Sequence, residues 1–595
     1  MKKFLISAIL IVSITHLFSQ NNELITFFEK SNYLETPRYD STIAYCKKLA
    51  DTSPLIHYTT FGISPEGRDL PLLIADKDKF FDPELIKKNG RTILLIQACI
   101  HAGEPDGKDA GLMLFRDFVI NKDISKLLEN VSVIFIPIYN VDGHERFGAY
   151  NRINQNGPKE MGWRTNASNL NLNRDYIKAE APETKAWIEL FNKWHPDFFI
   201  DCHVTDGSDY IYALTYGLEI NGNMDSNLTK WQKNIYLPYV TKSMEKAGYP
   251  IFPYVSFKEW HNIESGLTSW VTPPMFSQGY TAMVNCPGLL IETHMLKNYK
   301  TRVFATYKMI EYTLDVLNSS GKELQQNRKQ SDVISSSEEF RKKPFPLSFN
   351  FTRDSVIIDF KGMEYTSEKS DLTGGAWFKF GTKIKNYKLP YFNNIKPTAI
   401  ANLPEYYVIP RQWSFIEDIL RLHHINYFTL KNDTIIEVSG YRFNNVKFNS
   451  EPYEGRQLII SVKADTINYK MKLIHGSIII PMNQPKSRLI AHILEPMSPA
   501  SLLQFGYFNT IFEQKEYGES YILEPLAREM LANTPKIKEN FEKELKDNPD
   551  FKNNSYALLN WFYIRSKYAD NQQNVYPIGK IFRKSFFEQS QLLIK

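Results

Sequence analysis

Three residues of types that bind metal ions follow the ends of apolar, strand-like segments. His101 and Glu104 come directly after segment 92–100 in the run HAGE, and His203 follows segment 198–202. In open α/β sheets, ligands bind in the crevice beyond the carboxyl ends of the strands, so these side chains are expected to converge there. Two imidazoles and a carboxylate, with a water in the fourth position, suit a catalytic Zn2+. A capped turn leading into the next helix is the alternative explanation for HAGE alone.

Two further carboxylates stand close to this predicted zinc site. Asp201 lies two residues before His203, and the period of two in a strand places both on one side, where Asp201 is able to orient the histidine or approach the zinc-bound water. Glu292 ends the apolar segment 289–292. Partial burial raises the pKa of a carboxyl group toward the range useful to a general base, so Glu292 is the candidate base.

Arginine and asparagine residues supply the remaining chemistry. Arg164 follows a tryptophan, and Asn173 and Arg174 stand together in the run NLNRD. Such side chains near a zinc suit two tasks, which are capture of a substrate carboxylate and stabilisation of a developing oxyanion.

The order of these motifs resembles that of the M14 zinc carboxypeptidases. HAGE, NVDG at 140–143, NLNRD, DCH ending at His203 and LLIE ending at Glu292 follow one another as in that family, and EGR at 66–68 resembles its early segment. The resemblance covers residues 32–317. It implies a mixed, mostly parallel eight-stranded sheet flanked by helices, with one zinc.

The resemblance also implies a role for each site residue. His101, Glu104 and His203 resemble the zinc ligands, Glu292 the catalytic base, Arg164 the arginine that polarises the scissile carbonyl, and Asn173 and Arg174 the pair that holds the terminal carboxylate. Tyr280 is the nearest candidate for the tyrosine that the family carries on a mobile loop. Asn171 departs from the family, in which many members have an aspartate that orients the first zinc histidine.

These observations favour a secreted zinc metallocarboxypeptidase that hydrolyses a C-terminal amide bond of a peptide or protein, with Glu292 as the general base. One alternative is a zinc amidohydrolase that acts on cell-wall peptides or acylated amino acids. A catalytically silent binding protein with the same fold is the other. The silent protein would lack a ligand or the base, whereas this sequence has all four.

The elements that must position these residues divide the chain into parts. Segments 21–318 alternate strand-like and helix-like runs and predict the α/β catalytic domain, with strands at 92–100, 131–138, 198–202 and 289–292 and helices at 108–121, 182–194 and 227–247. The polar, serine-rich segment 319–343 predicts a linker. Residues 344–595 predict an accessory region that is β-rich and then helical, in which 434–481 has the pattern of a β-sandwich.

The chain as a whole sets further bounds. Its 595 residues exceed the size of a single core. Residues 1–20 have a basic start and a short apolar run, which predicts a cleaved signal peptide and a secreted or periplasmic protein without stable membrane insertion; an uncleaved anchor is the alternative. A net charge of +5 is too small for a nucleic-acid-binding footprint. The four cysteines predict buried thiols rather than a disulfide framework.

Overall fold

The computed structural model describes residues 23–260, 262–583 and 593–594. The predicted signal peptide, residues 1–20, lies outside the described residues. Within the described residues, no helix has both the length and the apolar character to cross a bilayer. The four cysteines are buried and unpaired, as predicted.

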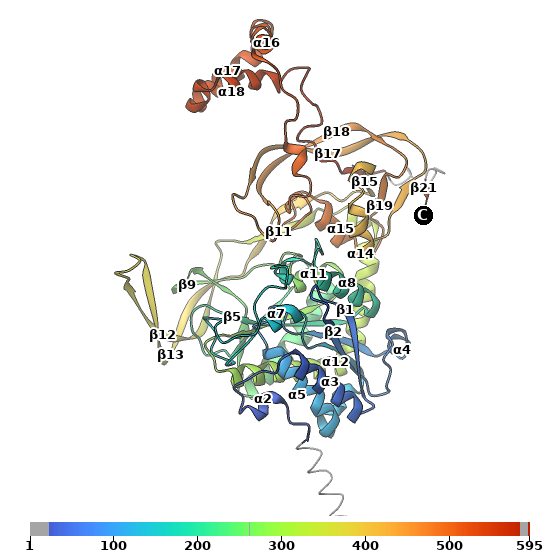
Figure 1. Ribbon diagram of the computed structural model, residues 1–595, viewed down its shortest axis with the longest axis vertical. Coiled ribbons are helices and arrows are strands. Elements are labelled where there is room, and N and C mark those ends of the chain that lie inside the picture. Colours follow the sequence, from blue (N-terminus) through green and yellow to red (C-terminus); the bar gives the residue numbers. More distant parts are fainter. Residues whose placement is uncertain (1–22, 261, 584–592, 595) are drawn as a thin grey trace, which may run out of the picture.

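An eight-stranded mixed sheet organises the N-terminal half of the chain (Figure 1). Its spatial order is β1 (Ile56–Ile63), β2 (Asp69–Ala75), β4 (Val131–Ile136), β3 (Thr92–Gln97), β5 (Phe198–Thr205), β10 (Gly288–His294), β6 (Leu214–Leu218) and β7 (Ile251–Pro253). The central strands β4, β3, β5 and β10 run parallel, while β1, β2 and β6 pair in antiparallel fashion. Every residue of β3, β4, β5 and β10 is buried, which explains their continuous apolar sequences.

Helices cover both faces of this sheet. Helices α5 (Asp106–Ile120) and α12 (Tyr299–Ser336) pack against each other on one side, and α8 (Pro182–Trp194) and α11 (Ser277–Met283) lie on the other (Figure 1). The expected eight-stranded α/β fold is confirmed.

The predicted linker is not an irregular segment for most of its length. Residues 319–336 continue helix α12, which is 38 residues long, and a short helix α13 (Glu338–Arg341) follows. The buried face of this part of α12 is made largely of small residues, which give no hydrophobic pattern in the sequence. A Cβ atom on Gly321, for example, would lie 2.1 Å from the Thr92 hydroxyl oxygen, so the helix approaches β3 closely there.

The C-terminal half is β-rich and then helical, as expected. A seven-stranded sheet has the order β18 (Ile459–Leu473), β17 (Thr434–Phe448), β20 (Gly579–Ile581), β15 (Tyr406–Ile409), β19 (Ile478–Pro481), β16 (Phe428–Leu430) and β21 (Leu593–Ile594). Residues 434–481 therefore supply three strands of one sheet and not the predicted sandwich. The fully buried helix α15 (Ser487–Leu494) shares a hydrophobic cluster with this sheet and contacts α11 and α12.

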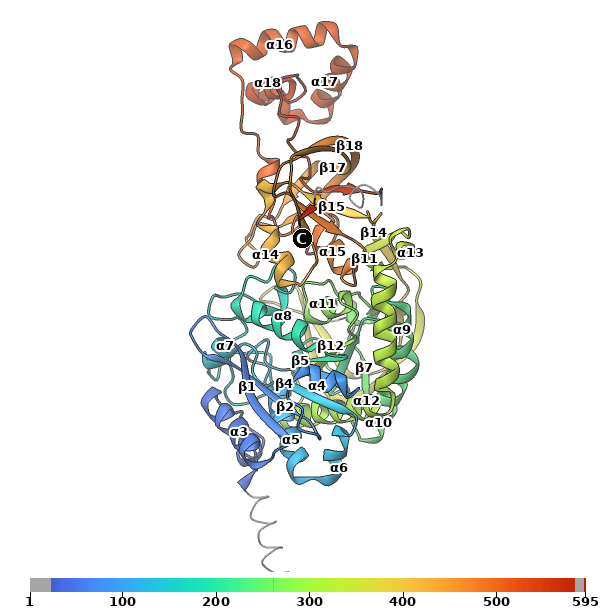
Figure 2. The same cartoon turned by 90° about the vertical axis from the view of Figure 1, so that its right-hand side faces the viewer.

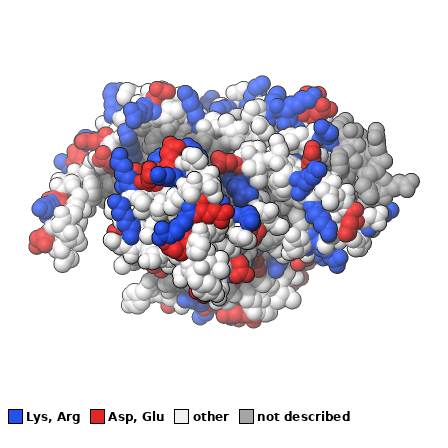
Figure 3. Space-filling model, turned by 90° about the horizontal axis from the view of Figure 1, so that it is seen from above, with Lys and Arg blue, Asp and Glu red and all other residues white. Residues whose placement is uncertain are grey.

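Two parts of the C-terminal half project from the body of the molecule. The long hairpin of β12 (Val356–Lys369) and β13 (Ala376–Phe392) pairs with β9 (Asn262–Thr268) and β8 (Ser256–Glu259) of the N-terminal half. Helices α16 (Ser520–Asn533), α17 (Pro535–Asp547) and α18 (Ser555–Tyr563) form a separate unit at the far end (Figures 1 and 2). On the face seen in Figure 3, basic and acidic side chains are interspersed.

Candidate metal centre

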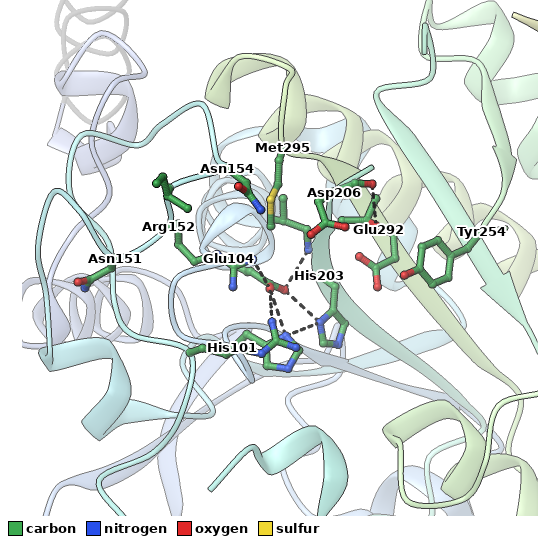
Figure 4. Close-up of a pocket in the computed structure, with 14 residues that line it drawn as sticks. His101, Glu104, Asn151, Arg152, Asn154, His203, Asp206, Tyr254, Glu292 and Met295 are labelled. Atoms are coloured by element: carbon green, nitrogen blue, oxygen red, sulfur yellow. Dashed lines mark hydrogen bonds and ion pairs between the residues drawn. The ribbon is translucent and has the colours of Figure 1, made fainter. Parts of the chain in front are cut away.

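Five of the eight predicted site residues meet in a pocket of about 310 Å3 at the carboxyl ends of β3 and β5 (Figure 4). Its lining includes the three predicted metal ligands, the predicted base, and neighbouring polar and aromatic residues: His101, Glu104, Asn151, Arg152, Asn154, Arg164, His203, Asp206, Tyr254, Glu292 and Met295.

The HAGE loop turns sharply after β3. Cys99 has a positive φ of 59°, which bends the chain toward the pocket. A Cβ atom on Gly103 would lie 2.7 Å from the carbonyl oxygen of Gly162, so the loop that bears Arg164 rests directly on the HAGE loop. Glycine at position 103 therefore lets two chemically important segments approach each other.

Three buried side chains aim their ligand atoms at one point. The Nδ1 atoms of His101 and His203 are 3.2 Å apart, and the two carboxylate oxygens of Glu104 lie 3.2 Å and 3.1 Å from them. The three ligand atoms all lie within 4.8 Å of one another. These are the residues and the types of donor that the sequence predicted for zinc.

Hydrogen bonds from the Nε2 atoms, which point away from the cluster, fix the tautomer and the ring orientation of both histidines. Nε2 of His101 donates to Asn171 Oδ1 at 3.1 Å, and that oxygen also accepts from the Asn173 amide, which sets its orientation. Nε2 of His203 donates to Asp201 Oδ2 at 2.9 Å. Once His203 gives up the proton on Nδ1, the Nδ1 atoms of both histidines present lone pairs beside the Glu104 carboxylate. Such a cluster of acceptors requires a cation, and the set fits Zn2+.

The charges of the cluster agree with this assignment. Burial lowers the pKa of His101 to about 3, so its ring is neutral. Burial also lowers the pKa of His203, but Asp201 and Glu104 outweigh burial and hold that pKa well above its usual value. Burial raises the pKa of Glu104, yet its histidine and arginine neighbours hold it well below 4.5. A bound cation would take the place of the proton on His203.

Glu292 lies next to His203 across the sheet. Strands β10 and β5 pair in parallel with Glu292 opposite His203, so both side chains point into the pocket. Burial raises the pKa of Glu292 to about 8, and the nearby Glu104 and Asp201 add to this effect while His203 opposes it. The arrangement places a carboxylate of raised basicity beside the candidate metal position.

Two arginines approach Glu104 from neighbouring loops. Nη2 of Arg152 donates to Glu104 Oε1 at 2.7 Å, and Nη1 of Arg164 lies 3.5 Å from the same oxygen. Arg164 was predicted from its motif, and its side chain is 41% exposed at the pocket. Arg152 was missed, because it stands in a polar loop without a motif.

The carboxylate-binding pair predicted by resemblance lies at the edge of the site. Asn173 is buried, and its Oδ1 accepts a hydrogen bond from the Ser277 amide at 3.0 Å. Arg174 is half-buried, with its guanidinium over the ring of Phe276 at 4.1 Å from the ring centroid. Both residues belong to the short turn that also carries Asn171.

The substrate-binding role predicted for Tyr280 is wrong. Tyr280 is fully buried in the core between aromatic side chains, and its hydroxyl lies 3.0 Å from His423 Nδ1. Tyr254 lines the pocket instead, with its ring beside Glu292 (Figure 4). The Glu292 charge, together with burial, raises the pKa of Tyr254. No local motif marks Tyr254, which follows the short strand β7.

Comparison with known proteins agrees with this geometry. The sequence model of the zinc carboxypeptidase family, peptidase M14, matches residues 42–306. Carboxypeptidase 2 of Trichophyton rubrum is 25% identical over 486 residues, which are 79% of this chain and 84% of the relative.

Solved structures give lower overall similarity. A metallo-carboxypeptidase from Pseudomonas aeruginosa is 16% identical over 48% of this chain and 70% of its own, with a TM-score of 0.36. Carboxypeptidase A from Helicoverpa armigera is 17% identical over 49% and 74%, also with a TM-score of 0.36. Residues 42–306, which span the eight-stranded sheet and carry the HAGE, NLNRD and DCH motifs, therefore match the zinc carboxypeptidase family, peptidase M14.

Proposed function

We propose that this protein is a secreted carboxypeptidase that removes C-terminal residues from peptides, with zinc held by His101, Glu104 and His203. The observation that carries the proposal is a buried cluster of acceptor atoms next to a carboxylate of raised pKa. Zinc, when bound, supplies a positive charge that acidifies a water molecule and polarises a carbonyl.

The chain's own residues then have separate tasks. Glu292 takes a proton from the attacking water and delivers it to the nitrogen of the leaving amine, and its raised pKa suits both transfers. Arg164 donates to the carbonyl oxygen as negative charge develops there. Arg174 and Asn173 hold the free carboxylate of the substrate, which restricts cleavage to the last peptide bond.

Zinc analysis and a peptide library test the proposal together. The purified protein should contain one zinc per chain, and the His101→Ala, His203→Ala double variant should contain none. Incubation with mixed peptides, followed by mass spectrometry, should release single C-terminal residues. Release of acyl groups or cell-wall fragments without any C-terminal trimming would instead support the amidohydrolase alternative.

Secretion has its own test. Residues 1–20 combine two lysines with a short apolar run, which is typical of a signal peptide. N-terminal sequencing of the mature protein from the source cells should begin near Gln20. A mature protein that retains Met1 would contradict this part of the proposal.

A further inference from the structure

One short turn carries three of the residues that surround the metal cluster. The 3-10 turn Leu172–Arg174 follows Asn171, whose side chain accepts from His101. Asn173 and Arg174 come from the same turn. The position of this turn therefore affects both the orientation of His101, a candidate metal ligand, and the position of the Arg174 guanidinium.

A hairpin from the C-terminal half contacts this turn. Residues 449–458 connect β17 to β18, and the Glu454 carboxylate at the tip accepts a hydrogen bond from the Asn171 amide at 2.9 Å. Nε of Arg174 donates to the Tyr453 hydroxyl at 3.1 Å. The two contacts join residues that lie 283 and 279 positions apart in the sequence.

The tip of the hairpin has a defined shape. Glu454 and Gly455 have positive φ values of 49° and 74°, and Tyr453 and Arg456 exchange two backbone hydrogen bonds of 2.8 Å and 3.0 Å. Positive φ at both central residues is the mark of a type I′ turn, which is a tight hairpin turn. Glycine at 455 allows the second of these conformations without strain.

The base of the contact is fixed by a second set of interactions. Nε of Arg456 donates to Glu180 Oε1 at 2.9 Å, and the Tyr507 hydroxyl donates to the same oxygen at 3.0 Å. The Arg456 guanidinium also lies 3.7 Å from the centroid of the Tyr507 ring. Glu180 lies six residues after Arg174. The hairpin is therefore bound to the chain on both sides of the turn Leu172–Arg174, at Asn171 and at Glu180.

Arg174 is thereby restrained at three points. The Phe276 ring supports its face, Nε bonds to Tyr453, and Nη1 donates to the Asn173 carbonyl at 2.7 Å. Among the described residues, Nη2 has no hydrogen-bond acceptor. A guanidinium that is fixed in advance and has a free edge loses little entropy when it binds a carboxylate.

We propose that Tyr453 and Glu454 are positioning residues of the peptidase site, and that the C-terminal half completes the pocket for the substrate's terminal carboxylate by fixing Arg174. This inference rests on the proposed function, because it assumes that Arg174 binds that carboxylate. The hairpin reaches the candidate zinc ligands only indirectly, through the contact of Glu454 with Asn171 and of Asn171 with His101.

Steady-state kinetics of full-length Tyr453→Phe test the inference. The change removes one hydroxyl and keeps the ring. For a peptide with a free C-terminus, KM should rise by roughly 3- to 10-fold, the range expected for loss of one hydrogen bond, while kcat stays within about twofold. Glu454→Gln should raise KM in the same direction. Tyr521→Phe, at an exposed site in helix α16, is the matched control and should match the parent.

A double variant separates this inference from the proposed function. In an Arg174→Ala background, Tyr453→Phe should cause no further rise in KM, because the hydroxyl acts through the arginine. An equal rise in both backgrounds, or no rise in either, overturns the inference even if the parent enzyme trims peptides normally. A parent enzyme with zinc but no activity on C-termini instead overturns the proposed function. Zinc content and melting temperature of each variant exclude misfolding as the cause.

Discussion

The parallel pairing of β10 with β5 places the proposed base, Glu292, directly beside the candidate metal ligand His203. Both side chains rise from fully buried strands, so their separation is set by backbone hydrogen bonds and not by mobile loops. A base that is placed on a rigid sheet keeps its distance to the metal position during turnover. We therefore expect that replacing the Glu292 carboxylate strongly lowers activity, whereas substitutions in distant loops leave its position unchanged.

Glu292→Gln should abolish turnover while zinc content and KM stay close to those of the parent. Glutamine keeps the size of the side chain, but its amide cannot accept the proton of the attacking water. General base catalysis is worth about 10²- to 10⁴-fold, so kcat should fall by at least that factor. The matched control is Glu264→Gln, because Glu264 is exposed on β9 and forms a surface ion pair with Lys385. A Glu292→Gln enzyme within about tenfold of the parent would show that another group is the base.

The site residues differ in how well the sequence predicted them. His203 and Glu292 lie on apolar strands, and the loop with His101 and Glu104 follows one. The sheet itself therefore brings these residues together, and the sequence pattern was informative. Arg152 and Tyr254 reach the pocket from loops, whose paths depend on packing that a single sequence does not display. Tyr280 was chosen because it lies near the base in sequence, but its helix α11 turns that ring into the core.

At the scale of elements, two glycines set how closely helix α5 lies on the sheet. A Cβ atom on Gly107 would lie 2.3 Å from the Cβ of Cys202, and one on Gly111 would lie 2.2 Å from the Phe135 ring. Cys202 directly precedes His203 in β5. The face of α5 that carries these two glycines therefore packs against the strand that bears the candidate ligand His203.

Gly107→Ala should destabilise the protein and weaken its zinc binding, because the added methyl group must push α5 and β5 apart. Overpacking of this kind typically costs about 1–3 kcal/mol. Thermal unfolding and competition with a zinc chelator measure the two effects. Gly375→Ala is the control, since the nearest atom to its Cβ is 3.6 Å away at the tip of the β12–β13 hairpin. Equal melting temperatures for both variants would contradict this account of α5.

Glu183, at the N-terminus of helix α8, has a buried carboxyl group whose ionisation at higher pH lowers the stability of the fold. Burial raises the pKa of Glu183 to about 7, although Asn166 donates to its carboxylate and opposes the shift. Because the folded-state pKa lies above the ordinary value of 4.5, stability is full below pH 4.5 and declines as the pH rises through 7.

Glu183→Gln should therefore melt at a higher temperature than the parent at pH 8, and the difference should vanish near pH 4. Glutamine cannot ionise, so the variant escapes the cost of a buried negative charge. Melting curves across this pH range provide the measurement. Glu189→Gln, on the exposed side of the same helix, is the control variant. A pH-independent difference for Glu183→Gln would mean that the carboxyl group stays in one protonation state.

The elements that the sequence predicted well are those with a strong apolar signal. Strands β3, β4, β5 and β10 and helices α5 and α8 lie where they were expected. The second half of α12 was missed, since its buried contacts use Gly321, Ser331 and Ser335 with only Leu324 as a large apolar residue. Small side chains allow close packing but leave no hydrophobic period in the sequence.

At the scale of the whole molecule, the two halves share one hydrophobic cluster, which runs from Leu24 to Ile578. Tyr280 contacts His423, β13 pairs with β9, and the 449–458 hairpin contacts the site turn. The sequence pattern predicted an α/β catalytic domain at residues 21–318, followed by a linker. Where the boundary between domains lies stays a prediction, but the packing argues that the halves stabilise each other.

The three-helix unit of α16–α18 differs from the rest in this respect. Its buried residues Ala527, Trp561 and Phe562 form a cluster of their own. The chain leaves the body and returns to it at one point, where the Asn574 amide donates to the Ile511 carbonyl at 2.9 Å. Figures 1 and 2 both show the unit away from the catalytic half.

Two deletions should therefore have opposite results. Replacement of residues 515–569 by a short glycine-serine linker should leave zinc content and peptidase activity within about twofold of the parent, since it removes only a separate cluster. A chain that ends at Ser320 should lose activity and aggregate. It lacks Leu324, the Arg328 contacts to Asn285 and Asp197, and the hairpin that restrains Arg174. Size-exclusion chromatography, zinc analysis and peptide hydrolysis distinguish the two proteins. A soluble, zinc-loaded and fully active chain ending at Ser320 would show that the catalytic half folds and works alone, and that the contacts between the halves contribute little to either stability or catalysis.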